Sequence, residues 1–283
     1  MIVAGRVQAC ITVLVLFLAL PLAAHDWPIP LLISDHHADH LEFFFRLTAD
    51  AALTMLVLDA HADTTANDNY SLIRRYAAGG NFFRAAELAG NHNWIHPLKP
   101  QTLIWISRIQ GFPRNDKLAG FSASLAQWGT ETHAHALNLQ ELRFWYNAAS
   151  ADADGAAGAL FVSVDLDFFY SEDHGPQDIP LVLDALFAFS SRWQGPVAWA
   201  FCLSRPWLPN DLYAWALLEE SLLWLNSRPE FTAPQVTLFD SPRVDTSLNA
   251  RAYRREGREI PAVREADMPC HIRELLRQLT ERQ

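Results

Sequence analysis

The feature that most restricts the fold of this chain is an apolar run that stops abruptly at polar side chains. Residues 56–58 read Leu-Val-Leu, and Asp59, His61 and Asp63 follow at intervals of two. Side chains two apart on an extended chain point to the same side, so a strand ending here presents its polar groups together. The stretch therefore predicts a buried strand whose carboxyl end carries chemistry.

A second stretch ends in the same way. Residues 160–164 read Leu-Phe-Val-Ser-Val, and they are followed by Asp165 and Asp167, again two apart. An isolated pair of acids at a strand end is usually part of a cap or a loop. Two strands that both end in this way are less common in one chain. We interpret the two stretches as halves of one site.

The remaining apolar runs alternate with helical patterns. Short strands are predicted at 29–34, 53–58, 103–106, 160–164, 197–203 and 235–239, and helices at 41–47, 67–89 (in two parts, divided by Gly79 and Gly80), 179–193, 211–225 and 270–279. This alternation predicts an α/β fold: a three-layer αβα arrangement with a mainly parallel sheet. Ligands of such sheets bind beyond the carboxyl ends of the strands, where both acidic motifs fall. Residues 111–157 give no clear pattern.

Composition indicates one domain and a separate leader. The 283 residues are 50% hydrophobic, and no linker divides them, which favours a single domain over residues 25–283. Arg6 precedes an apolar run at 11–22 that ends in Ala23-Ala24, the pattern of a secretory signal peptide over residues 1–24. We expect a secreted or periplasmic protein without stable membrane insertion once the leader is removed; an uncleaved anchor is the alternative. The net charge of −10 argues against a nucleic-acid partner.

The motif residues match a metal site in kind and number. Asp59, His61, Asp63, Asp165 and Asp167 offer carboxylate oxygens and one imidazole, and His36 or His37 could add a second, with His40 a third candidate. Oxygen-rich sets with one or two imidazoles suit manganese better than structural zinc. Four carboxylates exceed what one ion needs, so two bridged divalent ions, most simply Mn²⁺, are expected. Such a pair activates water at neutral pH, which makes hydrolysis the predicted reaction class.

The motifs Asp59-Ala60-His61-Ala62-Asp63 and Ser163-Val164-Asp165-Leu166-Asp167 resemble the two metal motifs of the arginase, or ureohydrolase, superfamily, which is related in fold to metal-dependent deacetylases. Asp35-His36 is similar to that family's Gly-Gly-Asp-His loop, and this favours His36 over His37 as a ligand. The resemblance implies two metals bridged by Asp59 and Asp165, one completed by His36 and Asp63 and the other by His61 and Asp167. Asp63 separates the pattern from the one-zinc deacetylases.

The chain also departs from that family. The stretch at 202–206 reads Cys-Leu-Ser-Arg-Pro, without the Glu that binds the guanidinium group in arginases. A divergent branch that resembles peptide arginases fits better, because a Trp-containing loop like 93–95 and an Asp-Leu-Asp-Phe-Phe ending occur there. This implies a small-molecule or peptide substrate with a guanidino group, such as a peptidyl arginine converted to ornithine and urea.

Roles for individual residues follow from this resemblance. Asp63 would steady the proton of the nucleophile, and His92 or His96 would protonate the leaving amine. The substrate contacts would come from Asn93, Trp94 and Ser204, in the loops where the chain leaves the family pattern. The missing Glu also motivates an alternative, an inactive metal- or ligand-binding protein of the same fold. Amide hydrolysis of the deacetylase kind is a third interpretation.

Overall fold

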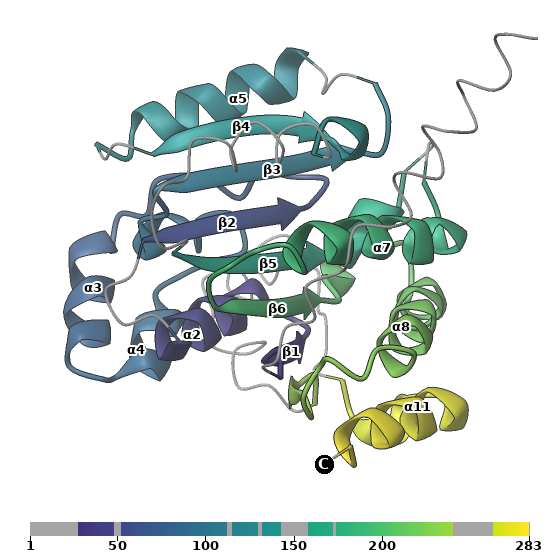
Figure 1. Cartoon of the computed structure of the whole chain (residues 1–283). Coiled ribbons are helices and arrows are strands. Elements are labelled where there is room, and N and C mark those ends of the chain that lie inside the picture. The colour runs from purple at the N-terminus through teal and green to yellow at the C-terminus, as the bar shows by residue number, and fades with distance from the viewer. Residues whose placement is uncertain are drawn as a thin grey trace, which may run out of the picture.

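The computed structural model describes residues 28–47, 52–111, 115–129, 132–142, 158–171, 174–239 and 263–282. Seven parallel strands form one sheet in the order β4-β3-β2-β5-β6-β1-β7 (Figure 1). The strands are β1 (Leu31–Ser34), β2 (Leu53–Leu58), β3 (Thr102–Arg108), β4 (His133–Asn138), β5 (Ala159–Asp165), β6 (Val197–Cys202) and β7 (Gln235–Thr237). The predicted α/β class with a parallel sheet is confirmed.

Helices cover both faces of this sheet. They are α2 (His37–Leu47), α3 (Tyr70–Ala78), α4 (Phe82–Glu87), α5 (Asn115–Ala126), α7 (Ile179–Ser190), α8 (Asp211–Asn226) and α11 (Cys270–Thr280). Short 3₁₀ helices lie at η1 (His96–Leu98), η2 (Leu166–Phe169), η3 (Pro176–Asp178), η4 (Arg205–Trp207) and η5 (Glu265–Asp267). Gly80 adopts a φ of 73° between α3 and α4, so the predicted glycine turn is present.

The alternation of side chains along β2 explains the two helical layers. Leu56 and Leu58 join a core with α7, α8 and α11, whereas Met55 and Val57 join a second core with α2 and α5. Successive strand residues point to opposite faces, so a continuous apolar run supplies both cores at once. The predicted three-layer αβα arrangement is confirmed.

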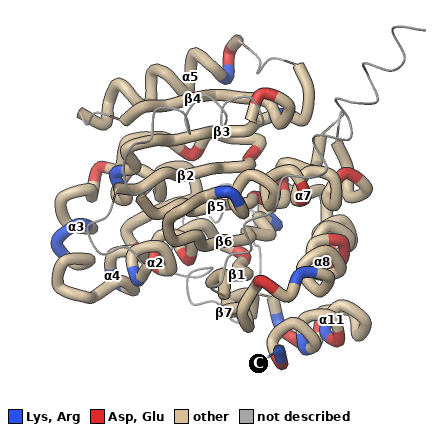
Figure 2. The backbone as a smooth tube through the Cα atoms, viewed as in Figure 1, with Lys and Arg blue, Asp and Glu red and all other residues tan. Residues whose placement is uncertain are grey.

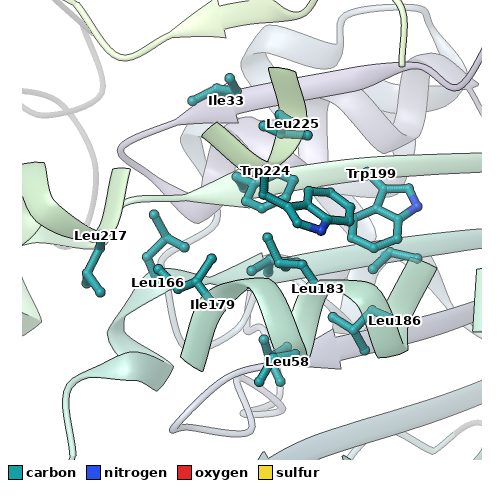
Figure 3. Packing of buried hydrophobic residues seen from close by; sticks show 14 of the residues in the cluster. Ile33, Leu58, Leu166, Ile179, Leu183, Leu186, Trp199, Leu217, Trp224 and Leu225 are labelled. Carbon is teal, nitrogen blue, oxygen red and sulfur yellow. The ribbon is translucent and has the colours of Figure 1, made fainter. Parts of the chain in front are cut away.

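The first core is the larger and is built around tryptophan. In Figure 3, α7 contributes Ile179, Leu183 and Leu186 against residues of the strands and of α8. Trp199 of β6 and Trp224 of α8 are stacked, with ring centroids 6.0 Å apart. Both rings are buried, so α8 is fixed against the strand that neighbours β5.

Charged side chains are concentrated outside these cores. Figure 2 shows the strands as mostly uncharged, with Lys, Arg, Asp and Glu mainly on the helices and connecting loops. In the described part of the chain, no helix has both the length and the apolar character needed to cross a bilayer. The predicted leader, residues 1–24, lies outside the described residues.

The order of the strands places the two acidic motifs side by side. From β2 the chain proceeds outward to β3 and β4, and it returns with β5 on the other side of β2. β2 and β5 pair in register from Leu53↔Ala159 to Leu58↔Val164. Their carboxyl ends therefore meet at the point where the strand order reverses, which is where open α/β sheets bind ligands.

Candidate metal centre

Each acidic motif is shaped by the same local turn. The backbone N–H of His61 donates to Asp59 Oδ1 at 2.6 Å, and the N–H of Asp167 donates to Asp165 Oδ1 at 3.0 Å. In both cases the first aspartate accepts from the residue two positions on, as Asp does when it ends a strand and begins a turn. One oxygen of Asp59 and one of Asp165 are thereby oriented by the chain itself.

The strand ends bring possible ligand atoms into three overlapping groups. Within each group, all ligand atoms lie within 4.8 Å of one another. The groups are His37, Asp59 and Asp63; Asp59, His61 and Asp167; and His37, Asp165 and Cys202. Asp59 belongs to the first two, which is the arrangement expected of a carboxylate between two ions. The four aspartates are buried and His61 is exposed.

The histidine that reaches the acids is His37. Its Nδ1 lies 2.7 Å from Asp63 Oδ2, and its Nε2 lies 3.2 Å from Asp165 Oδ2. His36 instead uses Nδ1 to accept the backbone N–H of Ala38 at 3.1 Å, at the start of α2. The expectation favoured His36 over His37, but the histidine that lies among the acids is His37, one residue further along the chain. His40 contacts Ser163 Oγ at 3.0 Å and lies behind His37, with ring centroids 5.1 Å apart.

The carboxylates repel one another in a buried setting. Burial raises the pKa of Asp59 well above its usual value, and the charges of Asp63, Asp165 and Asp167 raise it further. Burial, followed by the charge of Asp167, raises the pKa of Asp165 to about 8. Like charges crowded in a low-dielectric site favour protonation unless a cation balances them. The protein without metal therefore holds protons in this cluster at neutral pH.

The histidines of the cluster respond to the same charges. Burial alone would lower the pKa of His37, but the neighbouring Cys202, Asp165 and Asp63 raise it well above its usual value. His61 lies 3.2 Å from Asp167 Oδ2, and the hydrogen bond to that carboxylate raises the pKa of His61. Both imidazoles partly offset the negative charge.

Some carboxylate oxygens here remain available for a cation. Asp59 Oδ2 and Asp167 Oδ1 are buried and accept no hydrogen bond from the described residues. Buried polar atoms normally have a partner, and a bound ion is one accepted explanation when no protein group supplies it. Oxygen atoms of this kind, next to two imidazoles, fit a divalent cation.

Two further interactions fix the ligand side chains from outside the cluster. Trp94 is fully buried and donates its Nε1–H to Asp63 Oδ2 at 2.9 Å. Ser204, after β6, donates its hydroxyl to Asp165 Oδ2 at 2.9 Å. Asp63 and Ser204 adopt φ values of 50° and 48°, in the left-handed region that costs energy for residues other than glycine. The two hydrogen bonds therefore hold Asp63 and Ser204 in a strained conformation next to the other acids.

The structure changes the roles expected for the loop residues. Trp94 and Ser204 were expected to contact substrate, but their polar atoms bind aspartates of the cluster. Asn93 is also buried, and its Oδ1 accepts from the N–H of Gly90 at 2.8 Å and from Asn67 at 3.0 Å. Through these contacts Asn93, Trp94 and Ser204 support the loop and the ligands. None of the three belongs to the lining of the pocket above the cluster.

A pocket of about 320 Å³ lies above the cluster. Its walls include His37, His61, Asp63 and Asp165 from the cluster, Thr65 and His92 from the loops, Phe121 and Lys117 from α5, and Trp105 and Trp207. His92, one of the two residues predicted as proton donors, is therefore part of the pocket wall. In the described lining, the only acids are Asp63 and Asp165.

The second predicted proton donor, His96, does not reach this pocket. Its ring is buried between Tyr70 and Trp128, with centroid distances of 4.5 and 5.1 Å. Its Nδ1 accepts the backbone N–H of Asn67 at 3.1 Å, and burial lowers its pKa. His96 is therefore a packing residue of η1, which corrects the expected role.

Three contacts to the first acidic motif and the loop after it come from residues with no predicted role, two of them in the 111–157 stretch that shows no clear pattern. Lys117 of α5 donates to the carbonyl of Ala60, inside the first acidic motif, and Trp128 Nε1 donates to the carbonyl of Thr64 at 2.7 Å. Trp105, on β3, donates to the carbonyl of Asp59 at 3.0 Å. Neither α5, which carries Lys117, nor the segment directly after it, which carries Trp128, shows a clear apolar period, so the sequence held no usable signal for the first two contacts.

Replacing Trp94 with phenylalanine should weaken both folding and metal binding. The variant loses the hydrogen bond to the buried Asp63 carboxylate, worth about 1.5–3 kcal/mol in unfolding free energy. Freer movement of Asp63 should lower divalent-metal affinity by roughly 10- to 100-fold. Denaturant titration and metal isotherms would measure these effects. Trp207→Phe, at an exposed ring on the pocket wall, is the control; equal behaviour of the two variants would contradict the assigned role of Trp94.

Comparison with known proteins gives limited information. No family profile matches this sequence, and no curated protein matches it. Among solved structures, an arginase from Helicobacter pylori is similar over 71% of this chain and 74% of its own, with a TM-score of 0.40 and 16% sequence identity. Similarity at this level carries no information about activity.

Proposed function

We propose that this protein is a binuclear metal-dependent hydrolase that cleaves a C–N bond, with a guanidino group as the first candidate. The observation that carries the proposal is the convergence of four buried aspartates with His37 and His61, in two groups that share Asp59. A cluster of this kind is costly without cations, and its free oxygens and raised pKa values fit cation binding.

The ligand sets follow from the two groups that share Asp59. His37, Asp59 and Asp63 would hold one ion, and Asp59, His61 and Asp167 the other. Asp165, 3.2 Å from His37 Nε2, would complete the first set. The balance of oxygen and nitrogen favours Mn²⁺. When bound, such ions supply Lewis-acid polarisation and lower the pKa of water.

The surrounding residues would orient the reactants and move protons. Asp63, fixed by Trp94, offers a carboxylate at the pocket floor that can hold a proton of the attacking water. His92 lines the same pocket and is placed to donate a proton to the leaving amine. The rings of Phe121, Trp105 and Trp207 limit the access of bulk water to the reacting group.

The lining also bears on the substrate. A guanidinium cation is usually held by a carboxylate that is not a metal ligand, and the described lining contains only Asp63 and Asp165, both assigned to metals. A planar head group would therefore be positioned directly against the cluster. The same observation favours a second candidate, a protein that binds metal and ligand without turnover.

Product analysis separates the two candidates. We expect the Mn²⁺-loaded protein to release urea from at least one member of a panel of guanidino compounds and arginine-containing peptides. Release of a carboxylic acid from acylated amines would be followed in parallel, since it would indicate amide hydrolysis. Asp59→Asn should abolish turnover, because Asp59 belongs to both ligand groups. Two bound ions per chain without any product would refute hydrolysis and favour the binding protein.

A further inference from the structure

We propose that Cys202 is a sulfur ligand of the ion held by His37, which makes this metal site a mixed oxygen, nitrogen and sulfur site. The inference rests on the proposed metal centre and adds a ligand that an all-oxygen-and-imidazole set lacks. It implies that this position prefers a borderline ion such as Zn²⁺ or Co²⁺ to Mn²⁺, because thiolates favour softer ions.

The sheet itself brings Cys202 to the cluster. β6 pairs with β5 in register, and Cys202 is the partner of Asp165 at the last position of both strands. Residues paired across neighbouring parallel strands project to the same side. The thiol is therefore presented beside the carboxylate that faces His37.

The contacts of Cys202 lead into the site. Its Sγ lies within 4.8 Å of a ring nitrogen of His37 and of a carboxylate oxygen of Asp165. It also lies 3.2 Å from Ser204 Oγ, whose hydroxyl bonds to Asp165. Cys202 is fully buried, so the sulfur faces these polar groups and not solvent.

His37 gives a second, independent indication of a ligand. Its side chain is 2% exposed, and both ring nitrogens lie close to carboxylate oxygens. The residues that these nitrogens contact, Asp63 and Asp165, are members of the same ligand groups as His37. A buried imidazole that lies between carboxylates on both sides is placed as a metal ligand would be. The thiol shares a ligand group with His37 and Asp165, and its proton passes to solvent when the sulfur coordinates.

The chain supplies a matched control in its other described cysteine. Cys270 is free like Cys202, but it is exposed at the start of α11 and belongs to none of the three ligand groups found among the described residues. Replacing it with serine makes the same chemical change at a place without metal chemistry.

Cobalt spectroscopy tests the sulfur ligand without any assay of activity. The full chain, stripped of metal, would be titrated with Co²⁺, and the near-ultraviolet sulfur-to-cobalt charge-transfer band recorded together with the number of ions bound. We expect the band in the parent protein and in Cys270→Ser, and its loss in Cys202→Ser with cobalt still bound. Zn²⁺ affinity should fall by about tenfold or more in Cys202→Ser, whereas Mn²⁺ affinity changes less.

The possible results distinguish the two proposals. Cobalt bound without the band in the parent protein would overturn the sulfur ligand and leave the binuclear hydrolase standing. A band that persists in Cys202→Ser would also overturn it, because another thiol would then be the source. No cobalt, zinc or manganese bound to a folded parent chain would overturn the metal centre as well. Cys202→Ala, which keeps a small apolar side chain, shows whether a loss in the serine variant comes from misfolding.

Discussion

Asp165→Asn is expected to lower the affinity for divalent ions by at least about 100-fold and to abolish turnover. Asp165 is buried at the end of β5, 3.2 Å from His37 Nε2, and its Oδ1 is fixed by the N–H of Asp167. Asparagine keeps the shape of the side chain but removes the charge that attracts the ions, and a neutral amide is a weaker ligand for a hard cation.

The same substitution should stabilise the protein when metal is absent. Burial and the charge of Asp167 raise the pKa of Asp165 to about 8, so above that pH a repulsive buried charge is present. The neutral amide removes this repulsion. Asp165→Asn without metal should therefore unfold at a higher temperature than the parent at alkaline pH, the reverse of its effect with metal.

Elemental analysis and metal-binding isotherms would measure the loss of metal affinity. Thermal unfolding would measure the gain of stability in the metal-free protein. Asp68→Asn is a suitable control, because Asp68 is an exposed acid a few residues beyond the first motif. We expect the control to keep the metal content and melting temperature of the parent. A variant of Asp165 that still binds two ions with parental affinity would show that this residue is not a ligand.

The fold could be predicted where strands are buried on both faces. β2 and β5 consist almost wholly of buried residues, so their apolar runs stand out in the sequence, and the predicted 53–58 coincides with the observed strand. β4 was missed because it is an edge strand that pairs with β3 alone and is only half buried. Its sequence, His-Ala-His-Ala-Leu-Asn, has neither a continuous apolar run nor strong strand formers.

The candidate site was predicted in its acids but not in its surroundings. Asp59, His61, Asp63, Asp165 and Asp167 converge because their spacing of two is a local property of a strand end. The choice between His36 and His37 depends on how the chain turns from β1 into α2, where one residue rotates the side chain by about 100°. Cys202 and Ser204 reach the cluster only because β6 lies next to β5, a fact of topology that no local pattern contains.

Removal of metal should make the stability of this protein fall as the pH rises from about 6.5 to 8. The pKa of Asp165 is about 8 in the folded chain and near 3.8 when unfolded, so the folded state binds the extra proton across this interval. Stability falls with pH wherever the folded state binds more protons. His37, whose pKa is raised well above 6.5, acts in the same direction, since its contribution is complete below 6.5 and is lost as it deprotonates.

The pH at which this decrease in stability begins is set by His40, whose pKa is shifted in the opposite direction. Burial, followed by the charges of His37 and His36, lowers the pKa of His40 well below 6.5. A histidine kept neutral in the folded state favours unfolding at acidic pH, and this effect ends once the unfolded histidine has lost its proton near 6.5. Above that pH, the groups with raised pKa values determine the slope.

Thermal unfolding with a chelator and with Mn²⁺ would measure this slope and its origin. For Asp165 alone, the change between pH 6.5 and 8 amounts to about 2 kcal/mol, or a melting temperature lower by roughly 5 °C. With Mn²⁺ the decrease should disappear, because cations stabilise the charged carboxylates and bind more tightly as protons leave. The metal-free Asp165→Asn variant should also show a shallower slope. A metal-free melting temperature that is flat or rising over this interval would mean that the buried aspartates are not the protonated cluster inferred from the structure.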